Sequence, residues 1–243
     1  MKNIILSILV LVIAFASCQK DDYKIPKMPQ DTQNSRIPHK SQTQEASCDF
    51  IGFKYYSGAQ DTLGELENNY ILLGIDSIYS DNQIRNFIST ISVFDQNYDY
   101  NINKSNYKYK EIPLRLDTAK TCEQITQLIS DLEQYAIVSY AHYTIKTDNC
   151  LSLTWEPIGD LCVLCYTSNF YVKVLDENDL TDLSQTMAET NTELVQTITS
   201  LPGWYVLRAT KHSNGDALKM ANYFFETGLF KYSEPNITKY PVE

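Results

Sequence analysis

The same order of predicted secondary-structure elements occurs twice along this chain, and this repetition most narrows the folds open to it. Residues 70–145 and residues 170–234 each read as strand, helix, hairpin region, strand, helix, strand. Pro113–Leu116 corresponds to Val206–Ala209, and each is followed by a polar turn, a helix and an aromatic strand. Gene duplication and chance similarity of two α/β units are both open explanations. We therefore expect an α+β fold of two ferredoxin-like βαββαβ units, with antiparallel sheets that carry helices on one face.

The positions of the elements follow from the spacing of apolar residues. Helical spacing predicts four helices, around Ile84–Ile91, Ile125–Leu132, Asn178–Ala188 and Gly215–Thr227. Runs of β-branched and aromatic residues predict the strands. These are Tyr70–Ile75, Ile112–Leu116, Ile137–Thr144, Leu151–Trp155, Leu161–Tyr166, Phe170–Leu175, Leu194–Ile198, Trp204–Ala209 and Leu229–Ser233. Pro235 is expected to end the last strand, because proline cannot donate to a strand ladder.

Composition argues against several classes of function. The chain has 20 basic and 30 acidic residues, a net charge of −10, which repels nucleic-acid phosphates. Sequence motifs for phosphate-binding loops, zinc peptidases and serine hydrolases do not occur. No nucleophile is placed beside His142 or His212, and the carboxylates are scattered. We expect no catalytic activity, no cofactor and no metal.

The first residues resemble the leader of a bacterial lipoprotein. Ile4–Ala16 is an apolar stretch with the length of a signal-peptide core, too short to span a bilayer. Phe15-Ala16-Ser17-Cys18 resembles the lipobox, before whose cysteine the chain is cut. Gln19–Asp22 resembles the surface-export signal of Bacteroides-group lipoproteins. The resemblance implies a signal peptide over residues 1–17, acylation of Cys18 and a surface-exposed outer-membrane lipoprotein. A plain secretory signal with an incidental cysteine is the alternative.

The next segment differs in composition from the rest of the chain. Residues 18–47 are polar and proline-containing, which is typical of a disordered tether. The folded part is expected to begin near Cys48. We expect it to divide into a first α+β unit over residues 48–168 and a second unit over residues 169–243.

Five cysteines follow Cys18, enough for two disulfides and one free thiol. Cys162 and Cys165 form a CxxC motif, but on a strand residues three apart point to opposite faces, which disfavours joint metal binding. One interpretation is that all five are unpaired thiols. The other is a disulfide between Cys150 and Cys162, across the predicted Trp155–Asp160 hairpin.

Three short segments resemble the Asp-Ser/Thr-apolar acceptor motif for protein O-glycosylation in the Bacteroides group. They begin at Asp61, Asp76 and Asp117, and the acceptor residues would be Thr62, Ser77 and Thr118. The alternative is that Asp76 and Asp117 only cap strand ends.

The C-terminal part carries the most specific resemblance. Met220-Ala221-Asn222 through Pro235-Asn236, with an opening strand at Phe170–Val174, resembles the fervidolysin-like N-terminal prodomain of Bacteroides-group subtilisin-like serine peptidases. The similarity covers about a third of the chain well. The catalytic motifs of that family (Asp-Ser/Thr-Gly, His-Gly-Thr and Gly-Thr-Ser) are absent from this sequence.

The resemblance implies a binding function. Prodomains of that family inhibit their peptidase and assist its folding; their sheet packs on the enzyme and their tail lies in the substrate cleft. Here the tail would comprise Ile237, Thr238, Lys239, Tyr240, Pro241, Val242 and Glu243. We expect a surface lipoprotein that binds, inhibits or helps to fold a subtilisin-like peptidase. A structural or adhesive surface lipoprotein, or the relic of a truncated peptidase, are the alternatives.

Overall fold

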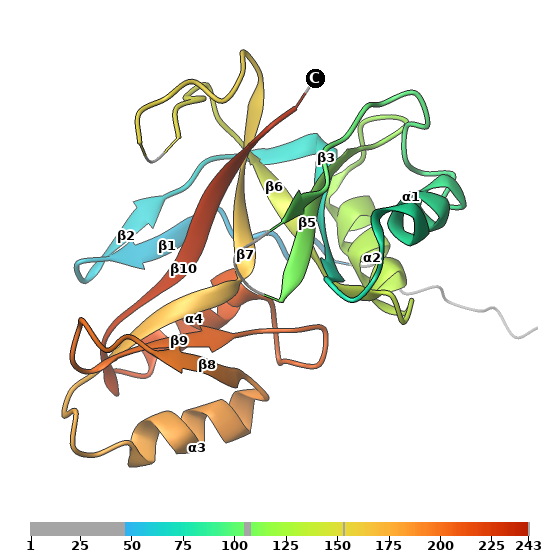
Figure 1. Ribbon diagram of the computed structural model, residues 1–243. Helices are drawn as coiled ribbons and strands as arrows, with labels where there is room; N and C mark the ends of the chain where they lie inside the picture. Colours follow the sequence, from blue (N-terminus) through green and yellow to red (C-terminus); the bar gives the residue numbers. More distant parts are fainter. Residues whose placement is uncertain (1–46, 105–107, 153, 243) are drawn as a thin grey trace, which may run out of the picture. The chain divides into compact units, whose positions relative to one another are not determined.

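The computed structural model describes residues 47–104, 108–152 and 154–242. The α+β fold is confirmed: four helices pack on one antiparallel sheet of strand order β4-β5-β3-β6-β7-β9-β8, with β10 also paired to β7 (Figure 1). The main-sheet strands are β3 (Leu66–Asp76), β4 (Asn103–Lys104), β5 (Tyr109–Arg115), β6 (Val138–Lys146), β7 (Cys162–Val174), β8 (Glu193–Thr197), β9 (Trp204–Arg208) and β10 (Phe230–Pro241). A separate hairpin is made by β1 (Phe53–Tyr56) and β2 (Ala59–Thr62).

The first half of the fold, residues 66–146, runs β3-α1-β4-β5-α2-β6. Its helices, α1 (Asp81–Ser89) and α2 (Cys122–Glu133), each begin at a capping box, at Ser80 and Thr121. Both helices bury their apolar stripe on one face of the sheet, where alternate strand residues form the core. That core includes Ile71, Leu73, Ile84, Ile112, Leu114, Ile125 and Leu132.

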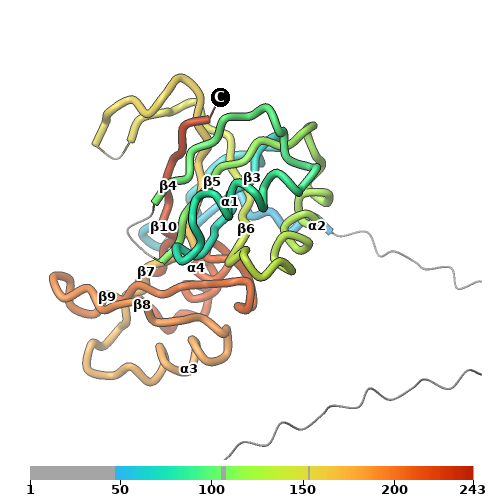
Figure 2. Tube along the Cα trace, turned by 45° about the vertical axis from the view of Figure 1, so that its right-hand side comes forward, coloured from blue at the N-terminus to red at the C-terminus, as the bar shows by residue number. Residues whose placement is uncertain are grey.

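The second half, residues 162–241, repeats this element order as β7-α3-β8-β9-α4-β10. Its helices are α3 (Thr181–Thr190) and α4 (Ala217–Glu226). Phe170 and Val172 of β7 face both helices, and α3 lies along β8 and β9 (Figure 2). In each half the first strand lies between the third and fourth strands of that half: β3 lies between β5 and β6, and β7 lies between β9 and β10. All of these pairings are antiparallel.

The two halves share one continuous sheet, which corrects the expectation of two separate ones. β6 joins β7 through the pairs Ile145–Leu164 and Lys146–Val163. The boundary predicted between residues 168 and 169 falls inside β7, which is one strand of 13 residues rather than two. Its polar centre is satisfied within the sheet, because the Asn169 side chain accepts a hydrogen bond from Arg208.

The predicted strand Leu151–Trp155 is wrong. Among the described residues of this segment only Leu151 forms a bridge, with Pro157, and Trp155 has a left-handed backbone (φ 66°) that interrupts an extended strand. Ser152 instead organises a local turn, since its hydroxyl accepts hydrogen bonds from the backbone of Thr154 and Glu156. Among the described helices, none has the length and apolar character that a membrane crossing requires.

Candidate functional site

The residues predicted to form a free tail belong to strand β10. Ile237, Thr238, Lys239, Tyr240 and Pro241 pair in order with Tyr166 to Cys162 of β7, and the Val242 amide donates to the Leu161 carbonyl at 3.0 Å. Glu243 lies outside the described residues. The prediction of a projecting, substrate-like tail is therefore wrong. These residues complete the protein's own sheet, and Tyr240 is buried in it, whereas Ile237, Thr238 and Lys239 are partly exposed.

Tyr240 reaches the face of the first half that α1 and α2 leave open. There its hydroxyl donates to Oε2 of Glu111, and the Tyr140 hydroxyl donates to Oε1 of the same carboxylate at 2.6 Å. Glu111 is 3% exposed, and burial raises its pKa although both tyrosine hydrogen bonds oppose that shift. This polar group ties β5, β6 and β10 together inside a tyrosine-rich core.

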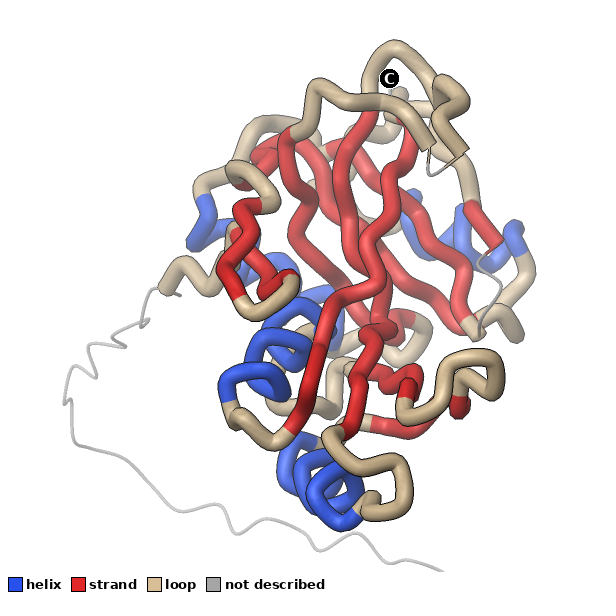
Figure 3. Tube along the Cα trace, turned by 90° about the vertical axis from the view of Figure 1, so that its left-hand side faces the viewer, coloured by secondary structure: helices blue, strands red, loops and turns tan. Residues whose placement is uncertain are grey.

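Pro235 does not end the last strand as expected. The ladder shifts register between Pro235 and Ile237, and the strand then continues to Pro241. Within the described residues β7 is the only strand paired with β10, so the missing proline amide breaks no ladder bond on the outer edge. The shift lies where β10 passes from the second half to the first. Figure 3 shows the strands as long, bent segments of the tube.

Two disulfides join cysteines of the described residues. One joins Cys150 to Cys162 as the sequence suggested, and the other joins Cys48 to Cys122, a pair that sequence reasoning did not find. Cys165 is a free, buried thiol, and burial raises its pKa far above the usual range. The interpretation of five unpaired thiols is therefore wrong. Among the described residues no group of side chains could hold a metal ion.

The remaining predicted sites are separate from one another. Thr62, Ser77 and Thr118 are exposed, as glycosylation requires. The Thr118 hydroxyl donates to Asp117 and accepts from Lys120. The signal peptide, Cys18 and residues 18–46 of the predicted tether lie outside the described residues.

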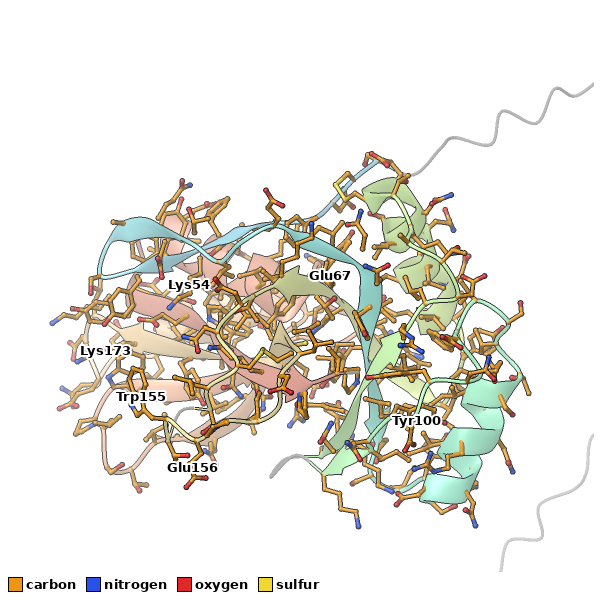
Figure 4. All side chains as sticks on the ribbon, turned by 90° about the horizontal axis from the view of Figure 1, so that it is seen from above. Lys54, Glu67, Tyr100, Trp155, Glu156 and Lys173 are labelled. Atoms are coloured by element: carbon orange, nitrogen blue, oxygen red, sulfur yellow. A yellow bond between two sulfur atoms is a disulfide. The ribbon has the colours of Figure 1, made fainter. Side chains whose placement is uncertain are left out.

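One face of the second half's sheet is covered by none of the described helices, and we call it the open face. Lys173 of β7 lies opposite Trp204 on β9 and Tyr232 on β10, so the three side chains share this face. Their aromatic rings are parallel within 2° at 5.9 Å, and the Lys173 ammonium lies 5.7 Å from the Trp204 ring. All three are partly exposed, and Figure 4 shows Lys173 and, on β1, Lys54, which pairs with Glu234 at 3.3 Å.

A cleft of about 510 Å³ lies where the two halves meet beside β6, and we call it the junction cleft. It forms because β6 pairs with β7 only at Ile145 and Lys146 and then separates from it. A loop bridges the gap, because the Lys211 amide of the second half donates to the Ser139 carbonyl at 3.3 Å. Within the first half, the Ala141 amide of β6 donates to Oε1 of Glu133 on α2 at 3.2 Å.

Three ionisable groups meet in this cleft. Glu133 has a pKa raised to about 6, first by burial and further by the nearby Asp216 carboxylate. Asp216 caps α4, accepting from the Lys219 amide, and also accepts from the Tyr166 hydroxyl at 2.8 Å. His142 is 1% exposed, and burial lowers its pKa, so the ring is neutral.

Sequence reasoning missed Glu111, Glu133 and His142 as a set, because it treated the carboxylates as a solvated surface and the histidine as isolated. Periodicity on α2 placed Glu133 beside the buried stripe, which was the available signal for it. No such signal existed for Glu111, since both faces of β5 are buried and the strand therefore shows no alternation.

Comparison with models of known protein families found no match, and comparison with curated proteins found none either.

Proposed function

We propose that this chain is a non-catalytic binding protein whose second half docks on a subtilisin-like serine peptidase through the open face. The sequence resemblance over Met220–Asn236 supports the class of partner. The strand order of the second half, with β7 between β9 and β10, is that of a ferredoxin-like unit and supports this interpretation. The observation that supports docking through the open face is that Lys173, Trp204 and Tyr232 lie side by side on it. Partly exposed aromatic side chains beside a cation are typical of protein interfaces.

The paired tail changes the proposed mode of action. Blocking a substrate cleft with Ile237–Pro241 would require five pairs with β7 to open and Tyr240 to leave its buried site. We therefore propose docking by the sheet face, with assistance to peptidase folding as the expected activity. Insertion of the tail into the active site is not part of this proposal.

Titration of a subtilisin-like peptidase with the full-length chain tests this function. We expect micromolar or tighter binding and a higher yield of refolded peptidase. The double variant Trp204→Ala/Tyr232→Ala should weaken binding by at least tenfold, about the effect of losing interface hot spots. Tyr223→Ala is the matched control, since Tyr223 is 41% exposed on α4, on the helix-covered side. Absence of binding by the wild-type chain would end the proposal.

A second candidate, adhesion, is favoured by Trp155. This side chain is 77% exposed and follows the turn at Ser152, within the segment closed by the Cys150–Cys162 disulfide. Large exposed aromatic groups held by a constrained loop are effective anchors in interfaces. If Trp155→Ala abolishes attachment of cells to a glycan or protein surface and leaves peptidase binding intact, adhesion is the better interpretation.

The proposed location is the outer membrane, with the chain anchored by acylated Cys18 and facing outward. Mass spectrometry of the mature N-terminus tests this directly. We expect a lipid-modified cysteine at residue 18 and release of the protein into the medium by Cys18→Ala. An unmodified N-terminus would favour the plain secretory signal.

A further inference from the structure

His142 lines the junction cleft, and one of its ring nitrogens has no donor among the described residues. The ring lies between those of Tyr140 and Tyr166, at centroid distances of 4.5 and 4.6 Å. Its Nδ1 lies 2.9 Å from the Tyr166 carbonyl oxygen, which can only accept, so Nδ1 carries the proton. Because the buried ring is neutral, Nε2 is a bare acceptor, and no described residue donates to it.

Glu133 supplies a second acceptor in the same cleft. Its Oε1 is occupied by the Ala141 amide, and its other oxygen has no donor among the described residues. Asp216 adds negative charge, but both of its oxygens already accept hydrogen bonds, from the Lys219 amide and the Tyr166 hydroxyl. Nε2 of His142 and the second oxygen of Glu133 are therefore acceptors without a donor among the described residues, although Lys211 and Lys219 also line the cleft.

The charges that line the cleft favour a cation. Asp49, Glu133 and Asp216 give three negative charges against two positive ones from Lys211 and Lys219, a balance of −3 + 2 = −1. The Lys211 ammonium is turned to the Tyr135 carbonyl at 3.0 Å, so it is held by a partner of its own. A primary ammonium group carries one positive charge and three donors, so two donors can serve the two free acceptors, the third can remain hydrated, and its charge offsets the excess negative charge.

We propose that the junction cleft binds the primary ammonium group of a small amine or of a peptide end, with Nε2 of His142 and the carboxylate of Glu133 as its acceptors. The cleft volume of about 510 Å³ lies in the range of small-molecule sites. This site is separate from the open face, so it does not depend on the peptidase proposal.

Calorimetric titration of the full-length chain at pH 8 tests the site with three probes: n-propylamine, trialanine amide, and N-acetyl-trialanine amide. We expect saturable millimolar or tighter binding of at least one of the first two, and none of the acetylated peptide. Binding of propylamine alone identifies a free amine as the source, and tighter binding of trialanine amide identifies a peptide end. The ¹⁵N resonance of His142 Nε2 should move toward lower frequency as it accepts a hydrogen bond.

Variants separate this site from general electrostatic attraction. Glu133→Gln should weaken binding at least tenfold, as expected for loss of a charge-assisted hydrogen bond. Asp131→Asn is the matched control, because Asp131 is an exposed carboxylate on the same helix that contacts only Gln127. Near-UV circular dichroism checks that both variants are folded. Equal weakening by both variants, equal binding of the acetylated peptide, or an unmoved Nε2 resonance during saturation would overturn the proposal, as would no binding of either amine.

Discussion

The hydroxyl of Tyr240 donates a hydrogen bond to the carboxylate of Glu111, which lies 129 residues earlier in the chain. Tyr140 donates to the other oxygen of that carboxylate, so the buried group has two donors from two different strands. This contact holds the C-terminal part of β10 on the first half of the fold.

Removal of the Tyr240 hydroxyl should lower stability. Tyr240→Phe deletes one hydrogen bond to a buried acid, which contributes about 1.5–3 kcal/mol when the acceptor is charged. Chemical denaturation measures the loss in the free energy of unfolding. Tyr223→Phe, at an exposed position of α4, is the control and should change it by less than about 0.5 kcal/mol. Equal effects of the two variants would contradict a structural role for the Tyr240–Glu111 contact.

Gly74 should not tolerate a side chain. It lies between Glu111 and Tyr140 in the sheet, and a Cβ atom added there would lie 2.2 Å from the Tyr140 ring. Gly74→Ala should therefore cost about 1–3 kcal/mol or more, because Tyr140 is fully buried and cannot move away freely. In a Tyr140→Leu background the same substitution should cost much less, and additive costs in this double-mutant cycle would rule out the steric cause.

The two disulfides should differ in their contribution to stability. Cys48–Cys122 closes a sequence separation of 74 residues, and Cys150–Cys162 one of 12. Loop-closure entropy predicts about 4.5 kcal/mol for the longer loop and about 3 kcal/mol for the shorter one. Thermal unfolding of the two double Cys→Ser variants measures this, and a larger loss from the Cys150–Cys162 pair would contradict the entropic explanation.

Glu133 should make stability depend on pH near neutrality. Its folded pKa of about 6 lies above the ordinary value of 4.5, so its favourable contribution is complete below pH 4.5 and is lost as pH rises through 6. Glu133→Gln cannot ionise. Its free energy of unfolding relative to wild type should therefore rise by about 1–2 kcal/mol between pH 4.5 and pH 8. Denaturation at both pH values checks this, with Asp131→Asn expected to show no such rise.

Elements with one buried face were predictable from the sequence. The stripe through Ile84 and Ile88 predicted α1, because burial on one side of a helix leaves a periodic signal. β3 and β9 are buried on both faces and were predicted instead from their runs of β-branched and aromatic residues. β7 was read as two strands because Thr167, Ser168 and Asn169 interrupt its apolar run, although tertiary hydrogen bonds satisfy them. The expectation that Pro235 ends the last strand failed for a related reason. Only the three-dimensional position of β10 shows that no second described strand requires an N–H donor at residue 235.

The candidate site was less predictable. The junction cleft depends on where β6 leaves β7, which no local pattern encodes. The Cys48–Cys122 pair likewise joins residues whose proximity arises only when α2 is packed.

The ladder of β7 and β10 also has a consequence for how the chain is made. β10 supplies an outer strand to the second half and Tyr240 to the core of the first, so neither half is complete until this strand has been synthesised. A nascent polypeptide that has emerged only as far as α4 still exposes one whole edge of β7 and leaves one oxygen of Glu111 without its donor, Tyr240. Such a chain remains unfinished, and thus open to chaperones or export machinery, until translation of its last described strand.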